Sequence, residues 1–122
     1  MKLFHDCVRD VMLYLEDNLE DTYFINSESI TLKKYSSKDI TYTLKKLAEA
    51  GFIEIDKVTY ENNFNIKWMT YYGHQFLDNI RDNKVWSETK SILSKFSSVS
   101  LNMVQNIASQ VISNLIIASL NK

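Results

Sequence analysis

The side chains with the clearest chemistry lie in the stretch SSKDITYTLKKLAEAGFI, from Ser36 to Ile53. Lysine ammonium groups neutralise phosphates, and threonine or tyrosine hydroxyls can reach a phosphate or a base edge in the DNA major groove. At helical spacing, one face of this stretch carries Lys38, Thr41, Tyr42 and Lys45. We interpret these residues as a candidate DNA-binding face. An ordinary solvated helix face has the same composition, and this second interpretation stays open.

A capped helix is expected to position these side chains. Ser36 or Ser37 can accept a hydrogen bond from the first turn, and Asp39 favours the positive end of the helix dipole. Gly51 supplies the left-handed residue that commonly ends a helix. The apolar residues at three- and four-residue steps form the predicted buried stripe: Ile40, Leu44, Leu47 and Ala48.

Charge is distributed unevenly, although the net charge of the 122 residues is only −1. Residues 1–32 hold two basic and seven acidic side chains, whereas residues 33–46 hold five lysines and one aspartate. No arginine occurs between Arg9 and Arg81, so bidentate readout of guanine by arginine is not expected here. Any attraction to phosphate is therefore local to the segment around the Ser36 helix.

The surrounding pattern predicts a mainly α-helical chain with a small β-hairpin. We expect a first helix over residues 3–19, a short strand over 22–25 and a brief second helix over 28–35. The runs FIEIDKVTY and FNIKWMTYY predict a hairpin that adds Lys57 and Lys67 to the candidate DNA-binding residues. Thr70 is expected to cap the next helix, and a further helix follows over 85–96. This order is typical of a winged helix-turn-helix domain, which we assign to residues 1–96.

Residues 97–122 form the second predicted region, a C-terminal oligomerisation helix. No charged residue occurs from Ser97 to Asn121. The predicted coiled-coil seam comprises Leu101, Val104, Ala108, Val111, Leu115 and Ala118. Dimerisation or packing on the domain is favoured. Asparagine and glutamine interrupt any membrane span, and the helix lacks the basic residues of an interfacial membrane helix.

Catalytic and metal chemistry find little support in the sequence. His5 and His74 have no second histidine or cysteine at ligand spacing, whereas zinc sites need three or four converging ligands. The single cysteine, Cys7, falls on the apolar side of a helix and is expected to be an inert core thiol. We expect no enzymatic activity, no metal and no cofactor. A lone cysteine and a charged N-terminus favour the cytoplasm.

Aromatic residues gather in and around the predicted hairpin: Tyr60, Phe64, Trp68, Tyr71 and Tyr72. Such a group can stack on single-stranded bases. Strand alternation explains most of them as core and cross-strand contacts instead, so base stacking is assigned a minor role.

Three segments carry a family resemblance: KLFHDCVRDVMLYLE, KDITYTLKKLAEAGFI and above all GHQFLDNIRDNKVW. They resemble an uncharacterised family of small proteins from Gram-positive bacteria and their phages, catalogued only as domain of unknown function number 2513. The resemblance covers nearly the whole chain. It implies a winged-helix fold and a phage or prophage setting, and it brings no activity, cofactor or site residues.

Three classes of function follow from these observations. The first is a small DNA-binding regulator of transcription that acts as a homodimer without a cofactor. The second is a protein-binding module, such as a phage factor that engages a host regulator or defence protein. The carboxylates Glu54, Asp56 and Glu61 in the hairpin support this alternative, because phosphate would repel them. The third and least favoured class is a membrane-associated effector that acts through the C-terminal helix.

Overall fold

The chain is mainly α-helical with a small antiparallel sheet, as the sequence predicted. Its computed structural model describes residues 2–20 and 23–121. The chain divides into two compact units, Met1–Gln75 and Phe76–Lys122, with the boundary inside helix α3 (Tyr71–Ile80). The helix over 83–93, which the sequence grouped with residues 1–96, therefore shares a unit with the C-terminal helix. Each unit is described separately below.

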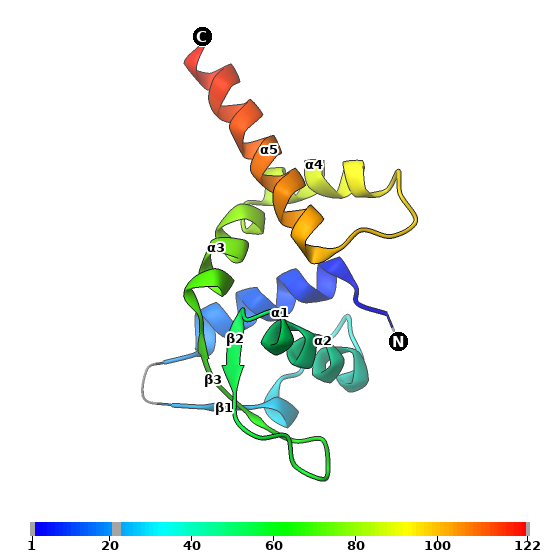
Figure 1. Cartoon of the computed structure of the whole chain (residues 1–122), viewed down its shortest axis with the longest axis vertical. Helices are drawn as coiled ribbons and strands as arrows, with labels where there is room; N and C mark the ends of the chain where they lie inside the picture. Colours follow the sequence, from blue (N-terminus) through cyan, green and yellow to red (C-terminus); the bar gives the residue numbers. More distant parts are fainter. Residues whose placement is uncertain (1, 21–22, 122) are drawn as a thin grey trace. The chain divides into compact units, whose positions relative to one another are not determined.

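Helices α1 (His5–Asn18) and α2 (Ser37–Glu49) pack together in the first unit (Figure 1). The predicted stripe of α2 is buried at Ile40, Leu44 and Leu47, whereas Ala48 is only half-buried. The Oγ of Ser36 accepts a hydrogen bond from the backbone N–H of Asp39 at 3.1 Å, which confirms the predicted cap.

The end of α2 also agrees with the prediction. Gly51 has a φ of 81°, in the left-handed region that glycine adopts at little cost. The backbone N–H of Phe52 donates to the carbonyl of Leu47, and that of Gly51 donates to the carbonyl of Ala48. These two bonds form a Schellman motif, which satisfies helix carbonyls that would otherwise lack partners.

The predicted second helix over residues 28–35 is wrong. Only a 3-10 turn, η1 (Ser27–Ser29), is formed there. The Oδ1 of Asn26 accepts from the N–H of Glu28, and the hydroxyl of Ser29 donates to the carbonyl of Asn26. Such local side-chain bonds compete with a continuing helix. The segment is instead held by tertiary contacts: Ile30 is buried, and the Tyr35 hydroxyl donates to Asp10 Oδ2 at 2.6 Å.

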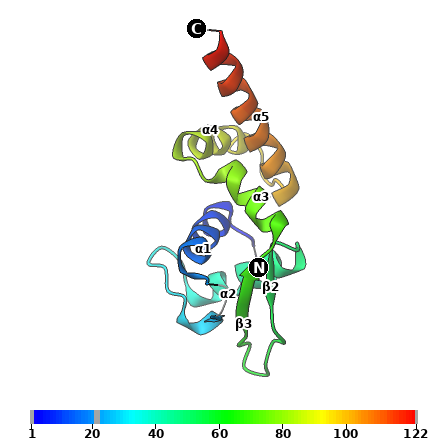
Figure 2. The same ribbon diagram turned by 90° about the vertical axis from the view of Figure 1, so that its left-hand side faces the viewer.

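Three short strands form the sheet in the order β1-β3-β2, with both pairings antiparallel. They are β1 (Ile25–Asn26), β2 (Ile53–Ile55) and β3 (Asn65–Met69). Figure 2 shows β2 and β3 side by side, joined at one end by the loop of residues 56–64. The predicted hairpin is thus present. The strand predicted over 22–25 is assigned only from Ile25, and Asp21 and Thr22 lie outside the described residues.

The sequence assigned most hairpin aromatics to core and cross-strand contacts, and the assignment to the core is wrong for four of the five. Only Phe64 is buried, while Tyr60, Trp68, Tyr71 and Tyr72 are exposed. Simple alternation would place Ile66 and Trp68 on one face of β3. The register with β2 shifts instead, so that Ile66 is opposite Ile55 and Trp68 is opposite Glu54. This irregularity turns Ile66 into the core and leaves the Trp68 indole exposed.

In the second unit, α4 (Asn83–Leu93) packs against α5 (Leu101–Leu120). Asp82 caps α4 by accepting from the N–H of Val85, and Ser100 caps α5 by accepting from that of Met103. The buried residues of this pair are Val85, Trp86, Thr89, Leu93, Val104, Ala108 and Val111. The middle of the predicted seam is therefore used inside one chain. Figures 1 and 2 show that the last turns of α5 continue past α4.

Helix α5 is also long and apolar enough to cross a membrane, judged by length and composition alone. Only 17% of its most apolar window is buried. The remaining seam residues reflect this exposure, since Leu101 and Leu115 are half-buried and Ala118 is exposed.

We predict that Gly73→Ala destabilises the first unit. A Cβ at this position would lie 2.1 Å from the carbonyl oxygen of Phe52, which is backbone and cannot rotate away. Overpacking of this kind typically costs about 1–3 kcal/mol, so the midpoint of urea unfolding should fall. Gln75→Ala, at an exposed position of the same helix, is the control. An unchanged midpoint for Gly73→Ala would show that the packing of α3 on Phe52 is looser than described.

We also predict that the Cys7 thiol reacts slowly in the native protein. The side chain is fully buried, and the hydroxyl of Thr43 donates to its Sγ at 3.4 Å. Burial raises the pKa of Cys7, which lowers the fraction of reactive thiolate. Labelling by a disulfide reagent at pH 8 should accelerate at least about 100-fold in denaturing urea, because native labelling requires local opening. Native labelling as fast as that of free cysteine would contradict the buried position.

Candidate nucleic-acid interface

The outward face of α2 and the tip of the hairpin loop enclose a groove of about 320 Å³. It is lined by Lys38, Thr41, Tyr42, Lys45 and Asn62. We call this feature the α2 groove. Four of the six predicted DNA-binding residues thus converge, and the helix period explains why: they lie opposite the buried stripe of Ile40, Leu44 and Leu47.

Asn62 also lines the groove and was not among the predicted DNA-binding residues. Its side-chain Oδ1 accepts a hydrogen bond from the ammonium group of Lys45. Its φ of 65° lies in the left-handed region, which asparagine tolerates better than most residues. The backbone N–H of Asn62 donates to the carbonyl of Thr59, which fixes the turn. The signal available in sequence was the pair Asn62-Asn63 at the centre of a predicted hairpin loop.

Lys46 extends the positive charge of α2 beyond the predicted residues. Its Nζ lies 5.4 Å from the centroid of the Tyr42 ring and 2.9 Å from Glu49 Oε2. The hydrogen bond to Glu49 raises the pKa of Lys46, so this ammonium group stays charged at neutral pH. The Lys46 ammonium group therefore lies beside the Tyr42 ring, and Glu49 offsets part of the charge of Lys46.

One carboxylate of the hairpin has a structural partner. The two carboxylate oxygens of Asp56 accept from the backbone N–H of Asn65 at 2.7 Å and from its side-chain amide at 2.9 Å. The side-chain oxygen of Asn65 in turn accepts from Asn26 at 2.9 Å. Asp56 therefore fixes the base of the loop. Glu54 and Glu61 are exposed.

The base of the loop is also tied to η1. The backbone N–H of Ser27 donates to the carbonyl of Phe64 at 2.8 Å, and the N–H of Phe64 donates to Ser27 Oγ at 3.2 Å. Ser27 is buried, so these bonds are shielded from water. They hold the hairpin loop relative to the segment that precedes α2.

A second hollow, of about 470 Å³, lies on the other side of Lys45. Lys45 lines it together with Ala48, Glu49, Ile55 and Val58. Three aliphatic side chains line this hollow, Ala48, Ile55 and Val58, whereas none lines the α2 groove. Lys45 thus lines two neighbouring hollows, both formed by α2 and the hairpin.

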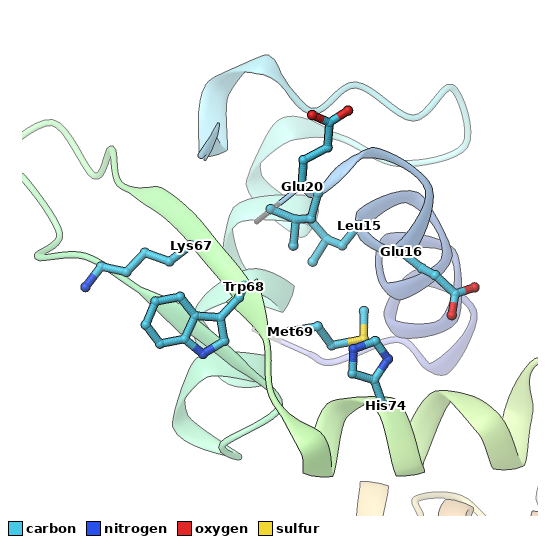
Figure 3. Close-up of a pocket in the computed structure, with 8 residues that line it drawn as sticks. Leu15, Glu16, Glu20, Lys67, Trp68, Met69 and His74 are labelled. Carbon is cyan, nitrogen blue, oxygen red and sulfur yellow. The ribbon is translucent and has the colours of Figure 1, made fainter. Parts of the chain in front are cut away.

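Two predicted DNA-binding residues lie elsewhere. Lys57 is exposed in the hairpin loop and does not line the α2 groove. Lys67 lines a separate pocket of about 120 Å³, whose other walls are Leu15, Glu16, Leu19, Glu20, Trp68, Met69 and His74 (Figure 3). The Lys67 Nζ lies 5.6 Å from the Trp68 ring centroid. The pocket is smaller than the roughly 300 Å³ at which small-molecule sites begin.

The histidines and the cysteine lie in separate places in the part of the chain that the structure describes. No group of three histidine, cysteine, aspartate or glutamate side chains converges within residues 2–20 and 23–121. His74 lines the small pocket beside Trp68, and Cys7 lies in the core with Thr43. The α2 groove is therefore the surface where predicted functional residues gather.

Comparison with known proteins identifies relatives by sequence. Residues 2–100 match the family model described as "Hypothetical protein (DUF2513)". An uncharacterized protein of Haemophilus influenzae is 30% identical over 119 residues, which cover 95% of this chain and 99% of that relative. No solved structure matches the chain significantly. The matches carry no information on phages or on a restriction to Gram-positive hosts. The extent of both matches shows that the chain belongs to the DUF2513 family.

Proposed function

We propose that the protein is a small winged-helix regulator that binds double-stranded DNA without a cofactor. The observation that supports this proposal is the α2 groove, in which two lysines, a threonine and a tyrosine converge beside the loop of a hairpin. Helix α2 would take the place of the recognition helix, and the loop of residues 56–64 that of the wing. The single cysteine and the charged N-terminus are our reasons for placing this regulator in the cytoplasm of a bacterial host. The family resemblance is our reason for proposing a phage or prophage setting.

The chemistry of the groove assigns a role to each side chain. Lys38 and Lys45 would neutralise phosphates, while Thr41 and Tyr42 would reach phosphates or base edges. The hydrogen bond from Lys45 to Asn62 leaves two further donors on its ammonium group. Helix α2 itself holds three lysines and two carboxylates, Asp39 and Glu49, so its own balance is positive.

The proposed winged helix departs from the common pattern at one place. The single turn η1 and the segment up to Tyr35 replace the helix that normally precedes the recognition helix. Tyr35 and Ile30 anchor that segment to the first unit. The support for α2 therefore comes from α1, η1 and the sheet.

We predict that Lys38→Glu with Lys45→Glu weakens binding to a generic labelled duplex at least about tenfold in fluorescence anisotropy. Each lost phosphate contact should also reduce the slope of log K against log salt concentration by about 0.9, so the double variant should lose nearly two. The measurement compares low with physiological salt. Circular dichroism checks that the variant keeps its helices.

The matched control reverses the charge of two lysines in the second unit, with the substitutions Lys84→Glu and Lys95→Glu. Both positions are exposed, and the change in net charge is the same. The control should retain most of its affinity, because the effect is attributed to the groove and not to total charge. Equal losses in both double variants would contradict the assigned interface, and absence of binding by the unmodified protein at low salt would contradict DNA binding itself.

A protein-binding module is the second candidate, because three large aromatic side chains lie exposed near the junction of β3 and α3. Trp68 is 53% exposed, Tyr71 is 71% and Tyr72 is 66%. Tryptophan and tyrosine are enriched among the residues that dominate protein interfaces. The occupant would be another protein, such as a host regulator or defence protein. Trp68→Ala with Tyr72→Ala should then abolish its capture from host lysate without affecting DNA affinity.

A further inference from the structure

One hydrogen bond joins the tip of the hairpin loop to the outward face of α2. The Lys45 ammonium group donates to Asn62 Oδ1, and both residues line the α2 groove. The Lys45 side chain is half-buried, whereas Asn62 is exposed at the end of the loop. The place of the Lys45 ammonium group in the α2 groove therefore depends on a residue of the loop.

Asn62 is held in place by the turn to which it belongs. Its backbone N–H donates to the carbonyl of Thr59 at 3.0 Å, and the N–H of Thr59 donates to the carbonyl of Asn63 at 2.8 Å. The Ser27 hydroxyl donates to Asn63 Oδ1 at 3.3 Å, which ties the turn to η1. These bonds do not involve Lys45, and a free lysine side chain has many rotamers. The contact therefore orders Lys45, while the turn itself orders Asn62.

Lys45 has a second place to lie if Asn62 does not hold it. It also lines the neighbouring hollow of about 470 Å³, and Glu49 stands at the edge of that hollow. The methylene groups of a lysine can pack on aliphatic side chains, which this hollow supplies at Ala48, Ile55 and Val58. Glu49 is four residues on from Lys45, the spacing at which a carboxylate attracts a lysine on a helix. In that position the ammonium group would leave the α2 groove and lose part of its effective charge.

The chemistry of the acceptor matters as much as its position. An amide oxygen carries no net charge, so the bond to Asn62 leaves the full charge of Lys45 available to a phosphate. Lys46 shows the contrast, because its Nζ lies 2.9 Å from the carboxylate of Glu49. Asn62 thus orders Lys45 without weakening its attraction to DNA.

We infer that Asn62 is a positioning residue of the α2 groove, which acts on DNA affinity by holding the Lys45 ammonium group where it meets a phosphate. This inference rests on the proposed DNA binding. A side chain that is ordered before binding loses less entropy when the complex forms. Two other roles for Asn62, direct contact with DNA and support of the turn alone, predict a different outcome when Lys45 is absent.

The test is a double-mutant cycle on affinity for a generic labelled duplex, measured by fluorescence anisotropy at low salt. Asn62→Gly removes the amide, and glycine adopts the φ of 65° readily. This variant should bind about three- to tenfold more weakly, because Lys45 must then be ordered on binding. In the Lys45→Met background the same change should leave affinity nearly unaltered, because the group on which Asn62 acts is missing.

The matched control is the Lys38→Met background. Lys38 lines the same groove, but the bond to Asn62 comes from Lys45. Asn62→Gly should therefore keep its full effect in this background. Circular dichroism and the midpoint of urea unfolding check that each variant is folded.

A second readout needs no DNA. Hydrogen bonding slows the exchange of ammonium protons with water, so nitrogen NMR of the lysine side chains should show a Lys45 signal that weakens in Asn62→Gly. The Lys38 signal should stay the same.

The possible failures point to different conclusions. An equal loss of affinity from Asn62→Gly with and without Lys45 would overturn the inference and leave DNA binding standing. An unchanged affinity of Asn62→Gly, or an unchanged Lys45 signal, would do the same. Absence of binding by the unmodified protein at low salt would overturn the proposed function and this inference together.

Discussion

The packing of α2 on α1 is the interaction on which the candidate interface depends. Burial of Ile40, Leu44 and Leu47 fixes the rotation of α2 about its axis. The helix period then forces Lys38, Thr41, Tyr42 and Lys45 to the opposite side. A rotation of α2 about its axis would turn these four side chains away from the surface they now form. The cap at Ser36 and the Schellman motif at Gly51 support it by defining where α2 begins and ends.

Short-range and long-range contacts have different roles at the α2 groove. Packing of α2 aims the lysines outward, but the hairpin loop determines the shape of the surface around them. Asp56 and Ser27 fix the base of that loop through hydrogen bonds to Asn65 and Phe64. At the tip, Asn62 meets Lys45. Asp56, Ser27 and Asn62 are polar residue types common in loops, but in this protein each makes a hydrogen bond that stabilises the hairpin loop.

The second unit shows that only part of an apolar helix is buried within the chain. The middle of the α5 seam packs on α4, whereas Ile116, Ile117 and Leu120 are exposed nearer the end of the helix. In the sequence, α5 has apolar residues on more than one side and is therefore predicted as one broad hydrophobic helix. Only the position of α4 separates the residues that stabilise the unit from those left exposed.

The sequence by itself determined the fold class, α1, α2 with both of its ends, the hairpin and the residues of the basic face, because these depend on local periodicity, capping and turn chemistry. Tertiary structure decided the rest. Side-chain bonds of Asn26 and Ser29 replaced the expected second helix, and a register shift in β3 exposed Trp68. Three further features depend on contacts between residues distant in sequence, which no local pattern encodes. Asn62 bonds to Lys45, Lys67 lies apart from the α2 groove, and α4 covers half of the α5 seam.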